Sequence, residues 1–545
     1  MHNPSSSLLA VALVLATASL GVHAQTPPDA GALQQQIERE RQQQMPKRIA
    51  PEKPAAPAAM QPAAGVAITV KQFRFTGNTL ISAEQLAPVV ANFLNRPLDF
   101  AQLQAAAAAV GEVYRAAGWV VNAYLPQQDI KDGIVTIHII EAVFGKLKTE
   151  GVPSKRVASA RIEAIFAAQQ ASGTSLNADA LDRGLLLADD LPGIAVAGSL
   201  AAGSRDGETD LILKMADEPW VIGEVAIDNT GARSTGADRL TANINITSPL
   251  GIGDLLSANA IHTRGSDYLR IGYTLPVGSD GWRVGLNASG LRYKLITLNP
   301  DQDKGTSSVV GLEASYPLIR SRLANLYLNL NADHKKFDNQ FGGATSSRYN
   351  IDSTSIALNG NLFDNWGGGG ANSGSLTWTG GSRDNEVGTT NQRFSKLRYS
   401  LSRQQVISND LSFFAQGSGQ DSGDKLDSSE KFYLGGAGGV RAYPSSEGGG
   451  DSGVLGNLEL RWKLPEGFIL TGFHDYGHVR NNDGAMSYSL QGYGLSLGWQ
   501  TPVGVNLKAT WAHRLGKNPN PTVTGRDQDG SLDKNRLWLS ASLPF

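Results

Sequence analysis

Apolar and polar residues alternate along the second half of the chain, from Glu218 to the end of the sequence. The segments 240–247, 325–331 and 493–499 each place apolar side chains on one face and polar or small side chains on the other. This period of two belongs to extended strands, and alternating segments of about ten residues are typical of transmembrane β-barrels. The pattern predicts an all-β membrane barrel over residues 217–545.

The connections between these segments also alternate, in length. Short turns, at 248–251, 276–278 and 502–504, alternate with longer polar loops, at 295–305 and 419–452. A soluble β-sandwich has similar strands but lacks this asymmetry, whereas outer-membrane barrels place short turns on one side and long loops on the other. At about 20 residues for each strand with its connection, we expect ~16 antiparallel strands.

Two units of equal length precede the barrel, at 67–141 and 142–216. In the first unit we expect a strand at 68–75, helices at 82–93 and 100–117, and strands at 119–125 and 134–140. In the second unit we expect a strand at 145–147, helices at 154–170 and 177–187, and strands at 194–200 and 209–215. Each unit is therefore predicted to be a small β-α-α-β-β domain, which gives α+β modules in front of the barrel.

The N-terminal residues predict export. Leu8 to Leu20 is apolar and is followed by Val22-His23-Ala24, so residues 1–24 are expected to be a cleaved signal peptide. Residues 25–45 favour a helix but are polar apart from Leu33 and Ile37, so two interpretations stay open, a disordered tail or a plug helix in a water-filled lumen. The Pro- and Ala-rich residues 46–66 are expected to be an extended linker.

Composition excludes several classes of function. A net charge of −2 without a dense basic stripe argues against nucleic acid as a partner, and the absence of Cys excludes disulfides and thiolate metal sites. We expect no enzyme activity, cofactor or metal. Residues 450–453 resemble the surroundings of a serine-protease nucleophile without its histidine motif. Residues 527–533 have partial calcium-loop spacing but lack the closing glutamate.

One arginine and one aspartate carry the most specific signal in the barrel. A glycine-rich run at 435–439 leads into Val440, Arg441, Ala442 and Tyr443, and a later strand carries Phe473, Asp475 and Gly477. If the loop folds into the barrel, the guanidinium can meet the carboxylate in a bidentate pair. The alternative is a surface loop with an unrelated aspartate on the strand.

The first unit carries motifs that resemble the first POTRA domain of two-partner-secretion transporters. They are Phe73, Phe75, Gly77, Asn78, Tyr114, Leu125, Pro126 and Gln127. Leu191-Pro192-Gly193 and Asp210 resemble the second POTRA domain. Phe73, Phe75, Tyr114 and Leu125 are expected in the core. The resemblance implies that an exposed strand edge binds an incoming extended chain by β-augmentation.

The loop and strand motifs of the barrel extend this resemblance. Residues 440–443 and 473–477 are similar to the motifs of the superfamily that includes two-partner-secretion transporters of the haemolysin/filamentous-haemagglutinin type and barrel-assembly factors, although Ala442 stands where that family usually has Gly. The last strand places Leu537, Leu543 and Phe545 on one face, with Phe545 resembling the signal read by the barrel-assembly machinery. Pro544 departs from that pattern because it removes a backbone donor.

The resemblance implies an outer-membrane transporter with periplasmic N-terminal domains. It would recognise one partner exoprotein, of adhesin or haemolysin type, by that protein's N-terminal secretion domain and translocate it without ATP. Other expected partners are outer-membrane lipid and, during biogenesis, periplasmic chaperones and the barrel-assembly machinery. A barrel insertase is the alternative, and a plain porin is disfavoured by the two POTRA-like units. The sequence leaves open the cargo and the oligomeric state.

Overall fold

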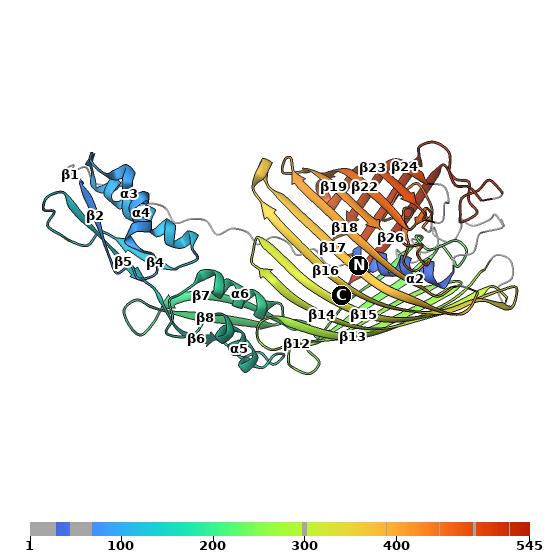
Figure 1. The fold of residues 1–545 in the computed structure, drawn as a ribbon, viewed down its shortest axis with the longest axis horizontal. Helices are drawn as coiled ribbons and strands as arrows, with labels where there is room; N and C mark the ends of the chain where they lie inside the picture. Colours follow the sequence, from blue (N-terminus) through green and yellow to red (C-terminus); the bar gives the residue numbers. More distant parts are fainter. Residues whose placement is uncertain are drawn as a thin grey trace, which may run out of the picture.

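The predicted fold class is confirmed. The computed structural model describes residues 29–43, 68–296, 302–388, 390–445, 447–482, 487–522 and 524–545. The predicted signal peptide and linker lie outside these residues. Two α/β modules are followed by a closed antiparallel barrel, which has 16 strands within the described residues (Figure 1). No helix of this described part is long and apolar enough to cross a membrane.

The first module packs two helices on a three-stranded sheet of order β2-β5-β4. Its elements are β1 (Ile68–Thr69), β2 (Gln72–Thr76), α3 (Ala83–Val90), η1 (Ala91–Phe93), β3 (Pro97–Leu98), α4 (Phe100–Ala116), β4 (Val121–Tyr124) and β5 (Ile134–Glu141). Alternation along β5 buries Val135, Ile137 and Ile139 against the helices. The helix α4 begins where the Asp99 side chain accepts from Gln102 N–H at 2.7 Å.

The second module repeats this plan with sheet order β6-β8-β7. Its elements are β6 (Val143–Glu150), α5 (Ser159–Gln169), α6 (Ala178–Asp189), β7 (Ile194–Ala202) and β8 (Glu208–Asp217). The expected start of α5 at Ser154 is wrong. Ser154 Oγ accepts from Arg156 N–H and Val157 N–H, each at 3.0 Å, and so closes a turn before the helix.

The barrel strands follow one another around the wall in chain order. They are β9 (Val221–Asp228), β10 (Arg239–Thr247), β11 (Leu255–Thr263), β12 (Ser266–Val277), β13 (Trp282–Lys294), β14 (Lys304–Arg320), β15 (Ala324–Phe341), β16 (Ala344–Asp364), β17 (Gly370–Val387), β18 (Gln392–Val406), β19 (Leu411–Asp421), β22 (Ser452–Lys463), β23 (Phe468–Arg480), β24 (Tyr488–Gln500), β25 (Asn506–Arg514) and β26 (Asn535–Pro544). Leucines at alternate positions, such as Leu312 and Leu401, are exposed on the outer face, where lipid would cover them.

The barrel closes where β26 meets β9, a junction that we call the seam. Its five residue pairs, from Ser540↔Asp228 to Pro544↔Glu224, are the fewest between neighbouring barrel strands in the described part of the chain. Two backbone hydrogen bonds of 2.9 Å between Gly223 and Phe545 extend the seam at one end. The Asn229 side chain extends it at the other, since Asn229 Oδ1 accepts from Leu539 N–H at 2.8 Å.

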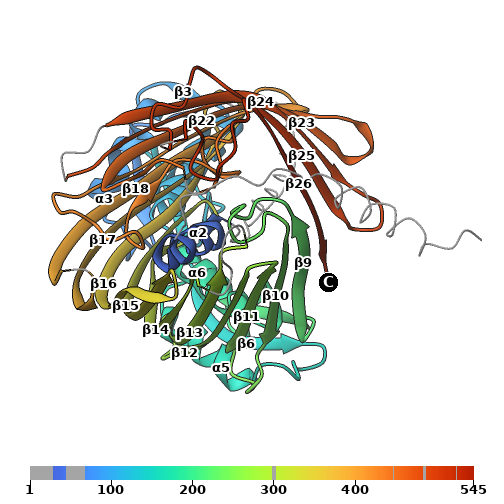
Figure 2. The same ribbon diagram turned by 90° about the vertical axis from the view of Figure 1, so that its right-hand side faces the viewer.

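The helix α2 (Ala30–Gln43) lies inside the barrel, and the view along the barrel shows it surrounded by strands (Figure 2). Its few apolar side chains, Leu33 and Ile37, are buried against lumen-facing aromatic residues of the wall, among them Tyr268 and Phe337. The amphipathic stripe is narrow because the rest of the helix meets polar groups of the wall. Residues 30–43 therefore form a lumen helix, as one of the two interpretations of the sequence required.

The second module is tied to the barrel rim by arginines. Arg320 at the end of β14 makes a bidentate pair with Asp190, at 2.7 and 2.9 Å, and Arg322 binds Asp182 at 2.9 Å. At the turn after β10, Ser248 Oγ donates to Arg156 O at 2.8 Å. These contacts place the module against the turns of the β10 to β15 sector of the rim (Figure 1).

Candidate functional site in the barrel lumen

The loop between β19 and β22 folds back into the lumen, and its glycines allow the tight path. A Cβ at Gly435 or Gly439 would collide with the carbonyl oxygens of Pro444 and Leu434, and Gly436 has a φ of +100°. Val440 N–H donates to Leu434 O at 2.8 Å, which closes the tip of the loop. Short strands β20 (Phe432–Tyr433) and β21 (Gly449–Gly450) pair below this tip.

Arg441 and Asp475 form the bidentate pair at the tip of the loop. Arg441 Nε–H donates to Asp475 Oδ2 at 2.9 Å and Nη2–H donates to Oδ1 at 2.6 Å, while the Arg441 backbone N–H also donates to Oδ2 at 3.0 Å. The guanidinium carbon lies 3.5 Å from the centroid of the Phe473 ring, a cation–π contact. Arg441 is 6% exposed and Asp475 is fully buried.

Three further residues complete the pair's surroundings, and the sequence analysis did not find them. Arg441 Nη1–H donates to Glu459 Oε1 at 2.8 Å, Asn457 Nδ2–H donates to Asp475 Oδ1 at 2.8 Å, and Trp538 Nε1–H donates to Arg441 O at 2.8 Å. Alternation along β22 places residues 457 and 459 on the lumen face. Only the register, which pairs Asn457 with Asp475, brings them to the arginine.

The other predicted motif residues lie in the same cluster. Val440, Ala442, Tyr443 and Phe473 are buried together, and Tyr443 packs under Arg514 at 4.4 Å. Ala442 is not one of the residues with positive φ, so its Cβ causes no backbone strain. Room for that methyl group comes from Gly492 on β24, where an added Cβ would lie 2.6 Å from Ala442 Cβ. An added Cβ at Gly477 would likewise lie 2.7 Å from the Leu434 side chain.

The helix α2 is held by contacts scattered along its length. Each contact reaches a different strand. Ala30 N–H donates to Asn339 Oδ1 on β15 at 2.9 Å, and Gln34 Oε1 accepts from Ser307 Oγ on β14 at 3.0 Å. Further along the helix, Glu38 Oε1 accepts from Tyr268 OH on β12 at 3.0 Å, and Glu40 pairs with Arg239 on β10. Arg39 donates to the loop carbonyls of Tyr433, at 2.6 Å, and Gly438, at 3.2 Å.

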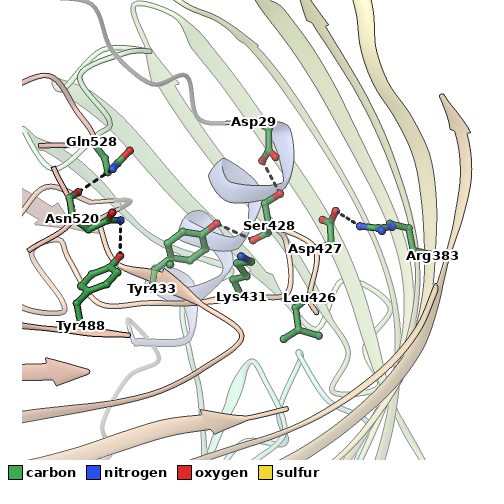
Figure 3. Close-up of a pocket in the computed structure, with 12 residues that line it drawn as sticks. Asp29, Arg383, Leu426, Asp427, Ser428, Lys431, Tyr433, Tyr488, Asn520 and Gln528 are labelled. Carbon is green, nitrogen blue, oxygen red and sulfur yellow. Dashed lines mark hydrogen bonds and ion pairs between the residues drawn. The ribbon is translucent and has the colours of Figure 1, made fainter. Parts of the chain in front are cut away.

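A polar cavity of about 440 Å³ lies beside the start of α2 (Figure 3). Arg383 of β17 donates to Asp427 at 3.3 Å on one side of it, and Asn520 donates to Tyr488 OH at 3.2 Å on the other. Charged and amide groups around a space large enough for water indicate a wet lumen around the helix. The cavity borders the residue before the helix, Asp29, while Leu33 and Ile37 remain buried against the wall.

The predicted POTRA residues mostly build the first module. Phe73 and Tyr114 are buried, Phe75 packs at the edge of their cluster, and a Cβ at Gly77 would collide with Ile139 O. Asn78 Nδ2–H donates to Ile81 O at 3.1 Å, and Pro126 is half-buried. Gln127 is exposed, whereas the neighbouring Gln128 binds the backbone of Thr136 through both side-chain atoms, at 2.7 and 2.8 Å.

Glu141 organises the turn that contains these motifs and was not predicted. It accepts from Thr79 N–H at 2.7 Å, from Leu80 N–H at 2.8 Å and from Tyr114 OH at 2.9 Å. Burial raises the pKa of Glu141, but these hydrogen bonds to the charged form outweigh it and leave the pKa below its ordinary value. Burial and the Glu141 carboxylate together raise the pKa of Tyr114.

The two enzyme-like sequences tie loops together. Asp451 accepts from Leu426 N–H at 2.8 Å and from Asn482 N–H at 2.7 Å. Asp527 pairs with Arg514 and accepts from Asn518 at 2.7 Å, and Asp529 pairs with Arg536 at 3.2 Å. Their carboxylates are thus occupied by backbone N–H groups of neighbouring loops and by arginines of β25 and β26.

Comparison with known proteins places this geometry in a family. The family described as Haemolysin secretion/activation protein ShlB/FhaC/HecB matches residues 207–501, and the POTRA domain of ShlB type matches residues 68–142. The chain is 26% identical to the Heme/hemopexin transporter protein HuxB of Haemophilus influenzae, over 99% of both chains.

Solved structures share the fold. CdiB from Escherichia coli superposes with a TM-score of 0.74 at 21% identity, over 96% of this chain and 100% of the other. BamA from Haemophilus ducreyi, lacking POTRA domains 1–3, gives 0.53 at 15% identity, over 88% of this chain and 100% of the other. The protein therefore belongs to the ShlB/FhaC/HecB family of haemolysin secretion/activation proteins, and it is a two-partner-secretion transporter of the outer membrane with its POTRA domains in the periplasm.

Proposed function

We propose that this transporter moves one unfolded partner exoprotein from the periplasm to the cell surface through the space that α2 occupies. The observation that supports this proposal is a polar lumen occupied by the folded loop and by one short helix, whose described contacts are separate bonds to different strands. A chain can replace such a helix without unfolding the barrel. We propose no catalytic step and no nucleotide, and Arg441, Asp475 and Phe473 act as the lock that keeps the loop in place.

The wall of β15 to β18 supports the passage of an extended chain. On its lumen face, below the loop, lie neutral side chains: Asn329, Asn331, Ser355, Asn359, Ser373, Ser375, Ser400 and Ser402. They already bind across strands, as Ser373 to Ser402 at 2.7 Å and Asn331 to Ser355 at 3.2 Å. Amides and hydroxyls donate and accept, so they can exchange hydrogen bonds with the peptide groups of any passing sequence.

The periplasmic modules supply an edge for capture. In the first module β4 stands at an edge of the sheet, since its described residues pair with β5 alone, and Asn122 and Tyr124 on it are exposed. We propose that the secretion domain of the partner adds a strand to such an edge, with Phe73, Phe75, Gly77, Asn78, Tyr114 and Pro126 maintaining the first module and Gln127 exposed on it. Deleting residues 67–141 is expected to abolish binding of that domain. If the remaining chain still binds the secretion domain, the recognition site lies outside residues 67–141.

The cargo class follows by analogy with relatives. One relative is named for heme/hemopexin transport and another, HpmB of Proteus mirabilis, for hemolysin transport. We propose a β-rich exoprotein of adhesin or haemolysin type, whose folding outside the cell makes return unfavourable and so gives direction without ATP. The role of Phe545 as the signal for the barrel-assembly machinery stays a prediction, as does help from periplasmic chaperones.

The test compares the proteins secreted by a deletion strain with those of the wild type. Loss of one large secreted protein, restored by the wild-type gene but not by the Asp475→Ala variant, supports transport. A general fall in outer-membrane barrels would instead support the insertase alternative, for which the fold similarity to BamA is weaker than that to CdiB.

A further inference from the structure

The helix α2 rests on one stretch of the folded loop, residues 427–433, which we call the seat. Ser428 Oγ donates to Asp29 Oδ1, just before the helix, at 2.7 Å (Figure 3). Arg39, in the second half of the helix, donates to Tyr433 O at 2.6 Å, so the seat follows α2 over most of its length. Between them, a Cβ added at Gly31 would lie 2.5 Å from Ser428 Oγ and 2.9 Å from Ser429 N. The helix can approach this closely because Gly31 has no side chain.

The seat is fixed to the wall by a buried ionic cluster around Glu430. Lys335 Nζ of β15 donates to Glu430 Oε1 at 2.6 Å, and Lys396 Nζ of β18 binds Oε2 and also donates to Glu430 O at 3.0 Å. The side chains of Glu430 and Lys396 are 3% and 4% exposed. Gln420 of β19 adds a bond to Glu430 O at 3.1 Å. The carboxylate thus joins the seat to two strands of the wall, β15 and β18.

The cluster also reaches the helix itself. Arg398 of β18 donates to Lys431 O at 3.1 Å. With its amide oriented to satisfy both neighbours, Gln35 of α2 accepts from the same guanidinium at 2.6 and 2.9 Å and donates to Ser429 O at 2.7 Å. Three cations, Lys335, Lys396 and Arg398, therefore surround the single carboxylate of Glu430. Lys335 is also attracted by Asp333 and Glu38, whereas Glu430 is the carboxylate that favours the charged form of Lys396. Loss of the Glu430 charge would therefore leave the buried Lys396 ammonium without its counter-ion, which is strongly unfavourable.

The lock uses a different sector of the wall, since Arg441 binds Asp475 and Glu459 on β23 and β22. The loop is thus fixed at two independent points. We propose that Glu430, clamped by Lys335 and Lys396, is the positioning residue that holds the seat, so that loss of the clamp releases α2 while the lock remains closed. This inference rests on the proposed function in taking α2 as the element that closes the lumen.

The test uses full-length purified protein without cargo in planar bilayers. Glu430→Gln is expected to raise the open-to-closed ratio of the pore about tenfold, equivalent to ~1.4 kcal/mol. Because the sequence has no cysteine, a single Leu33→Cys reports helix position by its rate of maleimide labelling. That rate is expected to rise with conductance, since Leu33 is buried against the wall when α2 is seated. The matched control is Asp421→Asn at the base of the same loop, where the Asp421 side chain is 71% exposed and pairs with Arg480.

The outcomes separate the two proposals. If deletion of residues 30–44 raises conductance but Glu430→Gln changes neither conductance nor labelling, the inference about the seat is wrong and the plug stands. If the deletion has no effect on conductance, the plug itself is wrong. Should Glu430→Gln fail to assemble, the milder Lys335→Gln, which leaves Lys396 in place, must still raise labelling. In a Glu430→Gln/Lys396→Met double variant we expect no further increase, because the interaction is already lost.

Discussion

The loop tip and the lumen helix α2 occupy the same lumen but are held in different ways. At the loop tip, one side chain collects the contacts: Arg441 binds Asp475 twice, Glu459 once and the Phe473 ring, and it is almost fully buried. Along α2, the bonds come from several residues of the helix and are divided among β10, β12, β14, β15, β18 and the loop.

This difference predicts which element moves. Breaking a buried ion pair from one side costs about 3–5 kcal/mol, whereas exchanging one ordinary hydrogen bond for water costs about 0.5–1.5 kcal/mol. The lock can open only in one large step. The helix can be released in several small steps, because its bonds go to separate strands. The lock therefore suits a permanent support and α2 suits a removable plug.

The largest effect is expected from breaking the lock. Arg441→Ala and Asp475→Ala should each reduce secretion at least about tenfold. Breaking the pair from one side is expected to cost more than about 1.4 kcal/mol even in a hydrated lumen, and 1.4 kcal/mol corresponds to a factor of ten. Outer-membrane abundance and heat-modifiable migration should stay near normal, since the strands do not depend on the loop. Immunoblots of secreted and membrane fractions measure both.

Double and conservative variants show whether the pair acts as one unit. The Arg441→Ala/Asp475→Ala variant should be little worse than either single variant. Arg441→Lys should restore little secretion, because an ammonium cannot reproduce the planar bidentate contact. Secretion losses that multiply in the double variant would contradict a shared role.

Deleting residues 30–44 tests the other half of the comparison. Conductance in planar bilayers should rise severalfold while secretion is largely retained, because the cargo would displace this helix in any case. Unchanged conductance would mean that α2 does not limit the pore. Deleting an equal length of the linker, residues 47–61, is the matched control and should leave conductance low.

A smaller effect is expected from the contact between Ala442 and Gly492. Gly492→Ala overpacks the loop tip, because the new Cβ would lie 2.6 Å from Ala442 Cβ, at a cost of about 1–3 kcal/mol. Protease sensitivity of the loop should increase and secretion should fall. Adding Ala442→Gly should restore both, since it removes the opposing methyl group. If the double variant is as protease-sensitive and as poor in secretion as Gly492→Ala alone, the contact between residues 442 and 492 is not what positions the loop.

The smallest effect is expected from replacing one residue of α2, Glu38. Glu38→Gln weakens the bonds from Tyr268 and Arg270 but leaves the rest of α2 in place, which corresponds to about 1 kcal/mol or ~fivefold in pore opening. Bilayer recordings compare the pore opening of this variant with that of the deletion of residues 30–44, and so measure how much Glu38 contributes to holding α2. An effect as large as that of the deletion would contradict distributed binding.

Much of the fold follows from local patterns in the sequence. Alternation and loop length are properties of adjacent residues, so they predicted the barrel and the α/β modules. The contact between Arg441 and Asp475 was predictable because both residues stand in recognisable motifs. Helix starts are less certain: Ser154 has the chemistry of an N-cap, but its hydroxyl closes a turn that leads to the barrel rim.

Other features depend on register and could not be found this way. Glu459 and Gly492 lie on strands whose alternation is visible, but their partners become neighbours only when the barrel closes. The sequence left α2 open between a tail and a plug for the same reason. Its polar residues look unpartnered until strands more than 190 residues away supply Arg239 and Tyr268.

The short seam has a mechanical consequence. A closed wall that is pushed outward carries tension around its circumference, and the bonds between neighbouring strands share that load. In the described part of the barrel, β15 and β16 share eighteen residue pairs but β26 and β9 share five. We expect a bulky, prematurely folded cargo segment to part the wall at this junction first, which stapling β9 to β26 with a disulfide would prevent. The width of a cargo segment that can cross is then limited by the strength of the seam and not by the diameter of the barrel.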